Sequence, residues 1–224
     1  MSTLVIIPTQ KEYDYFLKSL IINKSQCKQL SIGKLPVVKF PGLGITVSCG
    51  GLGKVQFAIH TQYLLHNIPD CELVICAGAA GALVDNLAIG DVVVATETVE
   101  HDIHNRFGPP LLPKFRGAET AVSQIKSLLP MPNSFRVHFG PIASGDEDVI
   151  DTQRKHEIQA LTGGMAVAWE GAGGARACAF NDVPFIEIRG ISDGANSTAS
   201  SDYENHLESV MQNIATLILS WVDV

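Results

Sequence analysis

Short runs of consecutive apolar residues alternate along the chain with segments in which apolar residues recur every three to four positions. A continuous apolar run is typical of a buried strand, and the longer spacing is typical of a helix with one buried face. These patterns predict strands over residues 4–7, 37–40, 45–49, 73–77, 92–98, 135–140 and 165–168, and over the apolar stretch before Asp193. They predict helices over residues 11–21, 54–65, 120–129 and 152–161, over the Gly/Ala-rich stretch after Glu170, and near the end of the chain.

The last of these helices has the most regular pattern. A capping box, Ser201-x-x-Glu204, is expected at its start, because these two side chains can satisfy free N–H groups of a first helical turn. One apolar stripe follows at helical spacing, formed by Leu207, Val210, Met211, Ile214, Leu217, Ile218 and Trp221. Such a stripe predicts a helix that packs its apolar face on the core.

The alternation of strands and helices predicts an α/β fold. Most strands are continuously apolar, which is typical of a sheet covered on both faces, so we expect a three-layer α/β/α arrangement with a central mixed, largely parallel sheet. The 224 residues contain no repeat or long linker, and residues 1–224 are expected to form a single domain. Pro109, Pro110 and Pro113 fall within residues 100–116, where we expect a loop or lid.

The overall composition is apolar, with 46% hydrophobic residues, 17% charged residues and a mean hydropathy of +0.19. Part of this apolar surface is expected to be buried in the core or between subunits. The sequence contains no apolar stretch long enough to span a membrane and no signal-peptide pattern at its start. Its five cysteines form no C-x-x-C pair, and we expect reduced thiols and a cytoplasmic location.

Charge and motif spacing argue against several other functions. The net charge of −7, without a Lys/Arg run, argues against nucleic acid as a partner. The glycine-rich segment that ends at Lys54 is no phosphate-binding loop, since Val55 occupies the required Ser/Thr position; it is either a tight turn or a backbone wall for a ligand. His101-Asp102-x-His104 matches no common zinc spacing, so we expect neither a metal nor a cofactor.

Three acidic residues are the candidates for chemistry. Glu170 stands at the entrance of the Gly/Ala-rich helix, Asp193 follows an apolar strand, and Glu12 lies on the first helix. Taken one by one, each has an ordinary explanation as a helix N-terminal acid, a turn cap and a solvated acid, respectively. Each also lies at or just beyond a strand end, beside small residues that leave room for a ligand.

The carboxyl ends of the predicted strands bring these acids toward one place. Gly78, Ser144 and Ser192 all follow apolar strand segments. In open α/β sheets, ligands bind outside the carboxyl ends of the strands. We therefore expect one crevice in which one carboxylate holds substrate hydroxyl groups while another handles a proton. That division of roles suits cleavage of a glycosidic bond.

An ordered set of motifs resembles the nucleoside phosphorylase/nucleosidase superfamily, and most closely its methylthioadenosine/adenosylhomocysteine nucleosidases. The resemblance covers nearly the whole chain. It is carried, in order, by Gly51-Leu52-Gly53-Lys54-Val55, Gly78-Ala79-Ala80-Gly81-Ala82-Leu83, Ile89-Gly90-Asp91-Val92, His101-Asp102, Ile142-Ala143-Ser144-Gly145-Asp146, Trp169-Glu170-Gly171-Ala172, Val183-Pro184-Phe185 and Arg189-Gly190-Ile191-Ser192-Asp193.

The resemblance implies roles for the matching residues. Asp193 would be the general acid that protonates or hydrogen-bonds the purine N7 as the base departs. Glu170 would hold the ribose hydroxyls, with Trp169 packed on the sugar. Glu12 would position and activate the attacking water. An acid at the base nitrogen and carboxylates near the sugar oppose the charges that develop during such a cleavage.

Further positions come with the same resemblance. Ser192 and Arg189 would support the groups that touch the substrate, and the backbone near Val149 would meet the edge of the base. Gly78 and Ala79 would line the site, although Ala79 stands where the nucleosidases often have serine. Trp169 replaces their usual methionine, and Glu147-Asp148-Val149 replaces a segment that normally carries an aromatic stacking residue.

Hydrolysis is favoured over phosphorolysis. Phosphorylases of this superfamily carry arginines around the phosphate, whereas neither the first loop, Pro8 to Glu12, nor the Cys76-Ala77 pair before Gly78 contains one. An acid at Glu12 would also repel phosphate. The alternatives are a futalosine hydrolase, a phosphate-dependent nucleoside phosphorylase and a non-catalytic nucleoside-binding protein.

A homodimer is the expected assembly. The loop over residues 105–112, with Phe107, resembles the region that completes the 5′ pocket of a neighbouring subunit in dimeric relatives. The expected partners are thus of two kinds. The resemblance implies a small-molecule nucleoside as the ligand of each subunit, and the loop implies a second copy of the chain.

Overall fold

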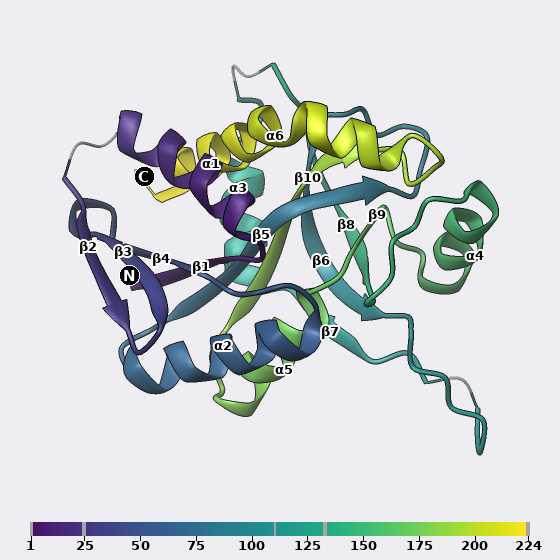
Figure 1. Cartoon of the computed structure of the whole chain (residues 1–224), viewed down its shortest axis with the longest axis horizontal. Coiled ribbons are helices and arrows are strands. Elements are labelled where there is room, and N and C mark those ends of the chain that lie inside the picture. Colours follow the sequence, from purple (N-terminus) through teal and green to yellow (C-terminus); the bar gives the residue numbers. More distant parts are fainter. Residues whose placement is uncertain (1, 24–25, 110, 132–133, 223–224) are drawn as a thin grey trace.

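A computed structural model describes residues 2–23, 26–109, 111–131 and 134–222 of the chain. Its strands form one mixed sheet, in which the central strands are flanked by helices on both faces (Figure 1). The elements are, in order, β1 (Thr3–Ile7), α1 (Gln10–Asn23), β2 (Lys28–Ile32), β3 (Leu35–Phe40), η1 (Pro41–Leu43), β4 (Ile45–Cys49), α2 (Lys54–Asn67), β5 (Leu73–Ala82), β6 (Val92–Glu100), β7 (Lys114–Arg116), α3 (Glu119–Ser127), β8 (Val137–Ser144), α4 (Thr152–Thr162), β9 (Ala166–Ala168), α5 (Gly171–Phe180), β10 (Phe185–Asp193) and α6 (Ala199–Val222).

The centre of the sheet is parallel. Strands β4, β1, β5 and β10 are hydrogen-bonded side by side in that order and run in the same direction. All residues of β1, β5 and β10 are buried, as expected for strands covered on both faces. The predicted fold class, an α/β/α arrangement around a mixed, largely parallel sheet, is confirmed.

The sheet also closes on itself at one side. Strand β10 pairs with both β5 and β6, and the path returns from β6 through β8 and β9 to β5. This closed circuit brings the ends of β5, β8, β9 and β10 around one opening. The sequence pattern did not predict it, because pairing partners are set by tertiary contacts rather than by local spacing.

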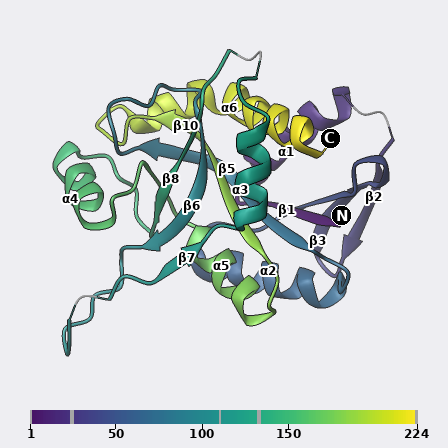
Figure 2. The ribbon, with the colours of Figure 1, turned by 180° about the vertical axis from the view of Figure 1, so that it is seen from behind.

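Two hydrophobic clusters fix the helices on opposite faces of the sheet. One cluster joins α1, α3 and α6 to the sheet through residues such as Phe16, Ile125 and Met211. The other joins α2 and α5 through residues such as Phe57 and Cys178. The view from behind shows α3 on the same side of the sheet as α1 and α6 (Figure 2). Helix α4 packs mainly against β8.

Several predicted boundaries were wrong. Strand β5 continues to Ala82 instead of ending at residue 77, so Gly78 lies inside the strand. Strand β8 begins at Val137 and runs to Ser144. The exposed edge strand β2 and the short strand β7, which lies inside the predicted loop, were missed. Short or solvent-exposed strands lack the continuous apolar run on which the prediction relied. Pro110, one of the three prolines assigned to that loop, lies outside the described residues.

The start of the last helix was also mispredicted. Helix α6 begins at Ala199, so the expected capping box at Ser201 lies inside its first turn. Ser201 Oγ donates a hydrogen bond to the Thr198 carbonyl. Asn196 Oδ1 instead accepts from Thr198 N at 2.9 Å, and the Thr198 hydroxyl contacts Asp202. These earlier polar residues order the chain before the helix, and the capping-box spacing further on has no such role.

The described part of the chain contains no helix that is both long and apolar enough to cross a membrane.

Candidate active site

A pocket of about 380 Å³ lies where the closed circuit of strands meets the start of α1 and α6. It is lined by residues that follow β1, by the chain before α2, by β5, by the loop after β8, by the junction of β9 with α5, and by the end of β10. The predicted crevice at the strand ends is therefore present. It contains Glu12, Glu170 and Asp193, the three acids named from the sequence.

Glu12 lies in the first turn of α1, directly after β1, and only 3% of its surface is exposed. Three donors hold its carboxylate. Ala79 N donates to Oε1 at 2.7 Å, while Thr9 N and Thr9 Oγ1 donate to Oε2 at 3.0 and 2.7 Å. These three donors fix the position and orientation of the Glu12 carboxylate in the pocket.

Glu170 is the residue that precedes α5, but its side chain makes no capping hydrogen bond to that helix. Its Oε1 accepts from Gly53 N at 3.2 Å, and its Oε2 accepts from Arg189 Nη2 at 3.1 Å. Burial raises the pKa of this carboxyl, and the Arg189 charge partly offsets that effect. The explanation of Glu170 as a simple helix N-terminal acid is therefore wrong, because the side chain turns toward the pocket.

Arg189 is 1% exposed and lies on β10, between two carboxylates. Besides Glu170, it donates from Nε to Glu187 Oε1 at 2.8 Å. Glu187 is itself fully buried and accepts from Thr98 Oγ1 at 2.6 Å. Two buried carboxylates thus share one buried guanidinium, whose own pKa is raised by the surrounding negative charge despite its burial.

Asp193 ends β10, where a register irregularity between Ile191 and Asp193 brings it opposite Gly81 of β5. Its Oδ2 accepts from Ser192 Oγ at 2.7 Å and its Oδ1 from Ala195 N at 2.9 Å. Burial raises the pKa of this carboxyl, although these hydrogen bonds act in the opposite direction. Asp193 therefore both caps the following turn and faces the pocket, and it holds a proton at higher pH than an exposed aspartate.

Two glycines of β5 make room for these acids. A Cβ atom at Gly78 would lie 2.9 Å from Glu12 Oε1 and 2.8 Å from Arg189 Nη1. One at Gly81 would lie 2.9 Å from Asp193 Oδ1. Gly78 therefore does not line the pocket itself, but it permits the side chains that do to approach the strand.

The other predicted site residues divide into two groups. Trp169, Ser192, Val149 and Ala79 all line the pocket together with the acids. The position of Trp169 is stabilised through its carbonyl, which accepts from Ser144 Oγ at 2.6 Å. Phe107 does not line it: the residue is fully exposed on the loop between β6 and β7, which projects away from the body (Figure 1).

The glycine-rich segment forms a tight turn, which was one of the two interpretations of its sequence. Gly51 and Gly53 have φ values of +83° and +80°, which suit the tight turn between β4 and α2. The same turn directs Gly53 N at Glu170 and places Leu52 on the pocket wall.

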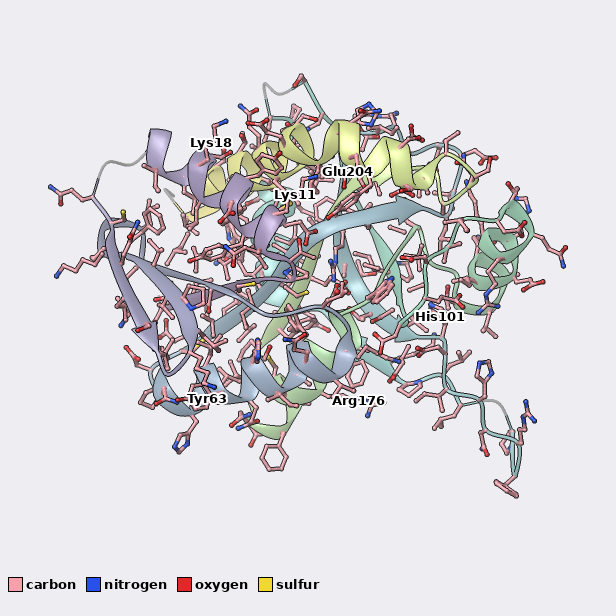
Figure 3. The ribbon with its side chains drawn as sticks, in the orientation of Figure 1. Lys11, Lys18, Tyr63, His101, Arg176 and Glu204 are labelled. Carbon is pink, nitrogen blue, oxygen red and sulfur yellow. The ribbon has the colours of Figure 1, made fainter. Side chains whose placement is uncertain are left out.

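Asp102 belongs to a structural network, whereas both ring nitrogens of the buried His101 lack a hydrogen-bond partner among the described residues. Lys54 Nζ donates to Glu100 Oε1 at 2.9 Å and also contacts Asp102, while Asp146 N donates to Asp102 at 2.9 Å. The side chain of His101, labelled in Figure 3, is buried. Its ring packs against Gly145. Within the described ranges no group of His, Cys, Asp and Glu side chains is arranged to hold a metal ion.

Sequence reasoning missed three polar residues of the pocket, Thr9, Ser200 and Tyr203. Thr9 is three residues before Glu12 and donates to it, so the pattern Thr-x-x-Glu at a helix start was the available signal. Tyr203 carried no such signal. It reaches the pocket because α6 runs along it, so that Ala199, Ser200 and Tyr203 all line it.

The fold and the acid-lined pocket at the strand ends define an α/β enzyme that handles a polar small molecule. The profile of the Phosphorylase superfamily matches residues 3–223, and the chain belongs to this superfamily.

Named relatives narrow the class. The chain is 32% identical over 184 residues to a 5′-methylthioadenosine/S-adenosylhomocysteine nucleosidase of Exiguobacterium sp., covering 79% of this chain and 78% of the relative. The nucleosidase of Neisseria meningitidis, solved with methylthio-immucillin-A, superposes with a TM-score of 0.85 at 26% identity, covering 100% and 99% of the two chains. The futalosine hydrolase of Helicobacter pylori gives a TM-score of 0.87 at 26% identity, covering 99% and 97%. The predicted class of enzyme, an N-glycosyl hydrolase of the nucleosidase kind, is confirmed.

Proposed function

We propose that the chain hydrolyses the N-glycosidic bond of a purine nucleoside and releases the free base. The observation that carries this proposal is the charge of the pocket. Its described lining residues include five acids, Glu12, Glu147, Asp148, Glu170 and Asp193, and a single cation, Arg189. That cation is already bound to Glu170 and Glu187. A neutral nucleoside and water suit this surface, whereas inorganic phosphate would meet uncompensated negative charge.

Asp193 is the proposed general acid. Departure of the base places negative charge on the purine, and a carboxyl that keeps its proton can neutralise it at N7. The protonated carboxyl offers one donor and one acceptor. Adenine presents the matching pair on one edge, the N7 acceptor and the N6 amino donor, whereas guanine presents two acceptors there. We therefore favour adenine as the base.

Glu170 and Glu12 are proposed to act at the sugar. Positive charge develops on the ribose as the bond breaks, and both carboxylates stabilise it. Glu170, held by Arg189 and Gly53 N, would accept hydrogen bonds from the ribose hydroxyls, with Trp169 packed beside the sugar. Glu12 would orient a water molecule and take its proton as the water attacks. Ser192, Val149 and Ala79 complete the walls.

More than one 5′ substituent of the nucleoside is compatible with this proposal. The names of the relatives make 5′-methylthioadenosine and S-adenosylhomocysteine the first substrates to test. The futalosine hydrolase of Helicobacter pylori superposes equally well, so a purine nucleoside with another 5′ substituent is the second candidate.

A homodimer is proposed as the working assembly. Phe107 is fully exposed on the projecting loop, and Ile59, Tyr63 and Phe180 expose apolar surface along α2 and α5. Exposed apolar groups of this extent favour burial against another surface. A second copy would cover them and would place each Phe107 loop where it can approach the partner's pocket. Light scattering that gives a monomer mass at micromolar concentration would contradict this part of the proposal.

The test is an assay of base release with and without phosphate. 5′-Methylthioadenosine, adenosine and inosine are incubated with the protein, and the free base is measured by chromatography. We expect adenine to be released without phosphate and phosphate to have no accelerating effect. Release that requires phosphate would make the protein a phosphorylase. Binding of a nucleoside without any release would make it a non-catalytic binding protein.

A further inference from the structure

Lys155 lies near the start of α4 and is only 9% exposed, although lysine is rarely buried without a strong partner. Its ammonium group is 3.6 Å from the carboxylate of Asp85, whose side chain is almost fully exposed to solvent. A solvated ion pair of this kind contributes little stability. The helix dipole also disfavours a cation near the N-terminus of a helix. Neither the ion pair nor the helix therefore accounts for a buried ammonium group at this position.

The ammonium group of Lys155 donates a hydrogen bond to the Gly194 carbonyl at 3.2 Å. Gly194 directly follows the proposed general acid, Asp193, and its carbonyl belongs to the peptide unit that also contains the N–H of Ala195. That N–H donates to Asp193 Oδ1 at 2.9 Å. A trans peptide unit is planar, so its C=O and its N–H point in opposite directions. The Gly194–Ala195 peptide is therefore held between Lys155 on one side and Asp193 on the other.

The backbone of Ala195 adopts a strained conformation. Its φ angle is +49°, in the left-handed region that residues other than glycine rarely adopt. Such a conformation persists where the surrounding structure enforces it. Ala195 is 1% exposed and packs in one hydrophobic cluster with Val149 and Val167. Packing thus holds the Ala195 side chain, while the hydrogen bond from Lys155 holds the peptide unit that precedes it.

We propose that Lys155 is a positioning residue, which holds the Gly194–Ala195 peptide so that the Ala195 N–H stays directed at the carboxyl group of Asp193. The inference rests on the proposed function, because it assigns Lys155 to the general acid of that reaction. A carboxyl group that is held through one oxygen keeps one orientation toward the base, and proton transfer depends on that orientation. Lys155 acts through the peptide and does not itself line the pocket.

The charge of Lys155 provides a readout that a purely structural residue would lack. Burial is the main influence on the pKa of Asp193 and raises it. Of the nearby charges, Asp202 on α6 raises this pKa further, and Lys155 on α4 lowers it. Removal of the lysine charge should therefore raise the pKa of Asp193, so that its proton is retained to higher pH. The other carboxyl groups that face the pocket are those of Glu12, Glu147, Asp148 and Glu170.

The experiment removes the ammonium group and keeps the rest of the side chain. Lys155→Met retains an unbranched apolar chain that preserves the packing, but it lacks both the charge and the donor. Lys155→Arg keeps both. Lys126→Met is the matched control, because it makes the same change on α3 outside the pocket. Release of adenine from 5′-methylthioadenosine is measured as kcat and KM from acidic to alkaline pH, and circular dichroism checks the fold of each variant.

For Lys155→Met, we expect the maximum kcat to fall about tenfold while KM changes by less than about twofold, because the acid is disturbed and the substrate contacts are not. The alkaline decline of its activity should lie at higher pH than that of the wild type. Lys155→Arg should recover most of the kcat and the wild-type pH profile. Lys126→Met should match the wild type throughout.

Either of two results would overturn the inference while the proposed hydrolysis stands. One is a wild-type kcat in Lys155→Met. The other is a rate that falls by the same factor at every pH, with the alkaline decline unmoved, which would indicate a structural role alone. If the wild type releases no base from any nucleoside, the proposed function fails instead, and NMR then decides the contact. The titration midpoint of the Asp193 carboxyl and the shift of the Ala195 amide proton should both differ between the wild type and Lys155→Met, and identical values would overturn the inference.

Discussion

Carboxyl groups lie at both ends of the pocket, but their bonding partners differ. At the sugar end, Glu12 accepts three hydrogen bonds and Glu170 is paired with Arg189, so both carboxylates are held by strong donors. At the base end, the hydrogen bonds of Asp193 come from a neutral hydroxyl and a backbone N–H. Burial without a bonded cation favours the protonated form of Asp193.

This difference teaches that the surroundings, and not the residue type, assign the roles of acid and base. Asp193 is buried without a bonded cation, whereas the Glu170 carboxylate is bound by the Arg189 guanidinium. The same reasoning explains why Arg189 is needed between Glu170 and Glu187. Without it, the sugar end would contain buried carboxylates that repel one another.

The change with the largest expected effect abolishes the acid at the base end. Asp193→Asn keeps the shape of the side chain but cannot supply the proton. We expect kcat to fall by about 10²- to 10⁴-fold. Nucleoside affinity and the circular dichroism spectrum should stay close to those of the wild type. A rate like that of the wild type would remove Asp193 from its role.

The second substitution removes Arg189, the cation at the sugar end of the pocket. Arg189→Met leaves Glu170 and Glu187 buried without their partner, which should lower the free energy of unfolding by about 3–5 kcal/mol. Urea denaturation measures this loss. The double variant Arg189→Met with Glu187→Gln is the control, and it should recover part of the stability because one uncompensated charge is gone. A stability equal to that of the wild type in the single variant would contradict the network.

A smaller effect is expected from weakening the contact with the sugar. Glu170→Gln retains hydrogen-bonding groups but loses the charge that strengthens bonds to the ribose hydroxyls. We expect KM to rise about tenfold, with a smaller change in kcat. Steady-state kinetics with adenosine separates the two constants. A change confined to kcat would show that Glu170 acts in the transition state alone.

The mildest perturbation is a change of pH. Burial raises the pKa of Asp193, so its proton is retained above the pH at which an exposed aspartate loses it. Activity should therefore fall as the pH rises through this raised pKa, by about tenfold per unit at the high-pH limit. A profile of kcat/KM against pH measures this fall. The residual activity of Asp193→Asn should not show it, and the assignment is wrong if both proteins share the same alkaline decline.

The sequence predicted much of the fold because local pattern and burial agree in its main elements. Strands β1, β4 and β6 are mostly buried and lie near their predicted positions, and α6 follows its apolar stripe. The prediction failed where burial is low or length is short, as in β2 and β7. It also failed at the start of α6, where a capping-box spacing occurred inside the first turn.

Some residues of the candidate site were also predictable from the sequence, and others were not. The order of motifs pointed to Glu12, Glu170 and Asp193, and all three line one pocket. The pattern did not point to Tyr203 or to Glu187. Tyr203 has no motif around it, and Glu187 reads as one acid within an apolar strand. Tyr203 lines the pocket because α6 runs along it, and Glu187 matters because it accepts a hydrogen bond from the buried Arg189.

By itself, the sequence determined which residues can do chemistry and which elements hold them, because residue type and local spacing are properties of the chain alone. The tertiary structure decided how each carboxyl behaves. Closure of the sheet through β5, β10, β6, β8 and β9 buries Asp193 without a bonded cation and places Glu170 against Arg189. The proton affinity of a carboxyl depends on burial and on neighbouring charges, and both are set only when distant segments meet.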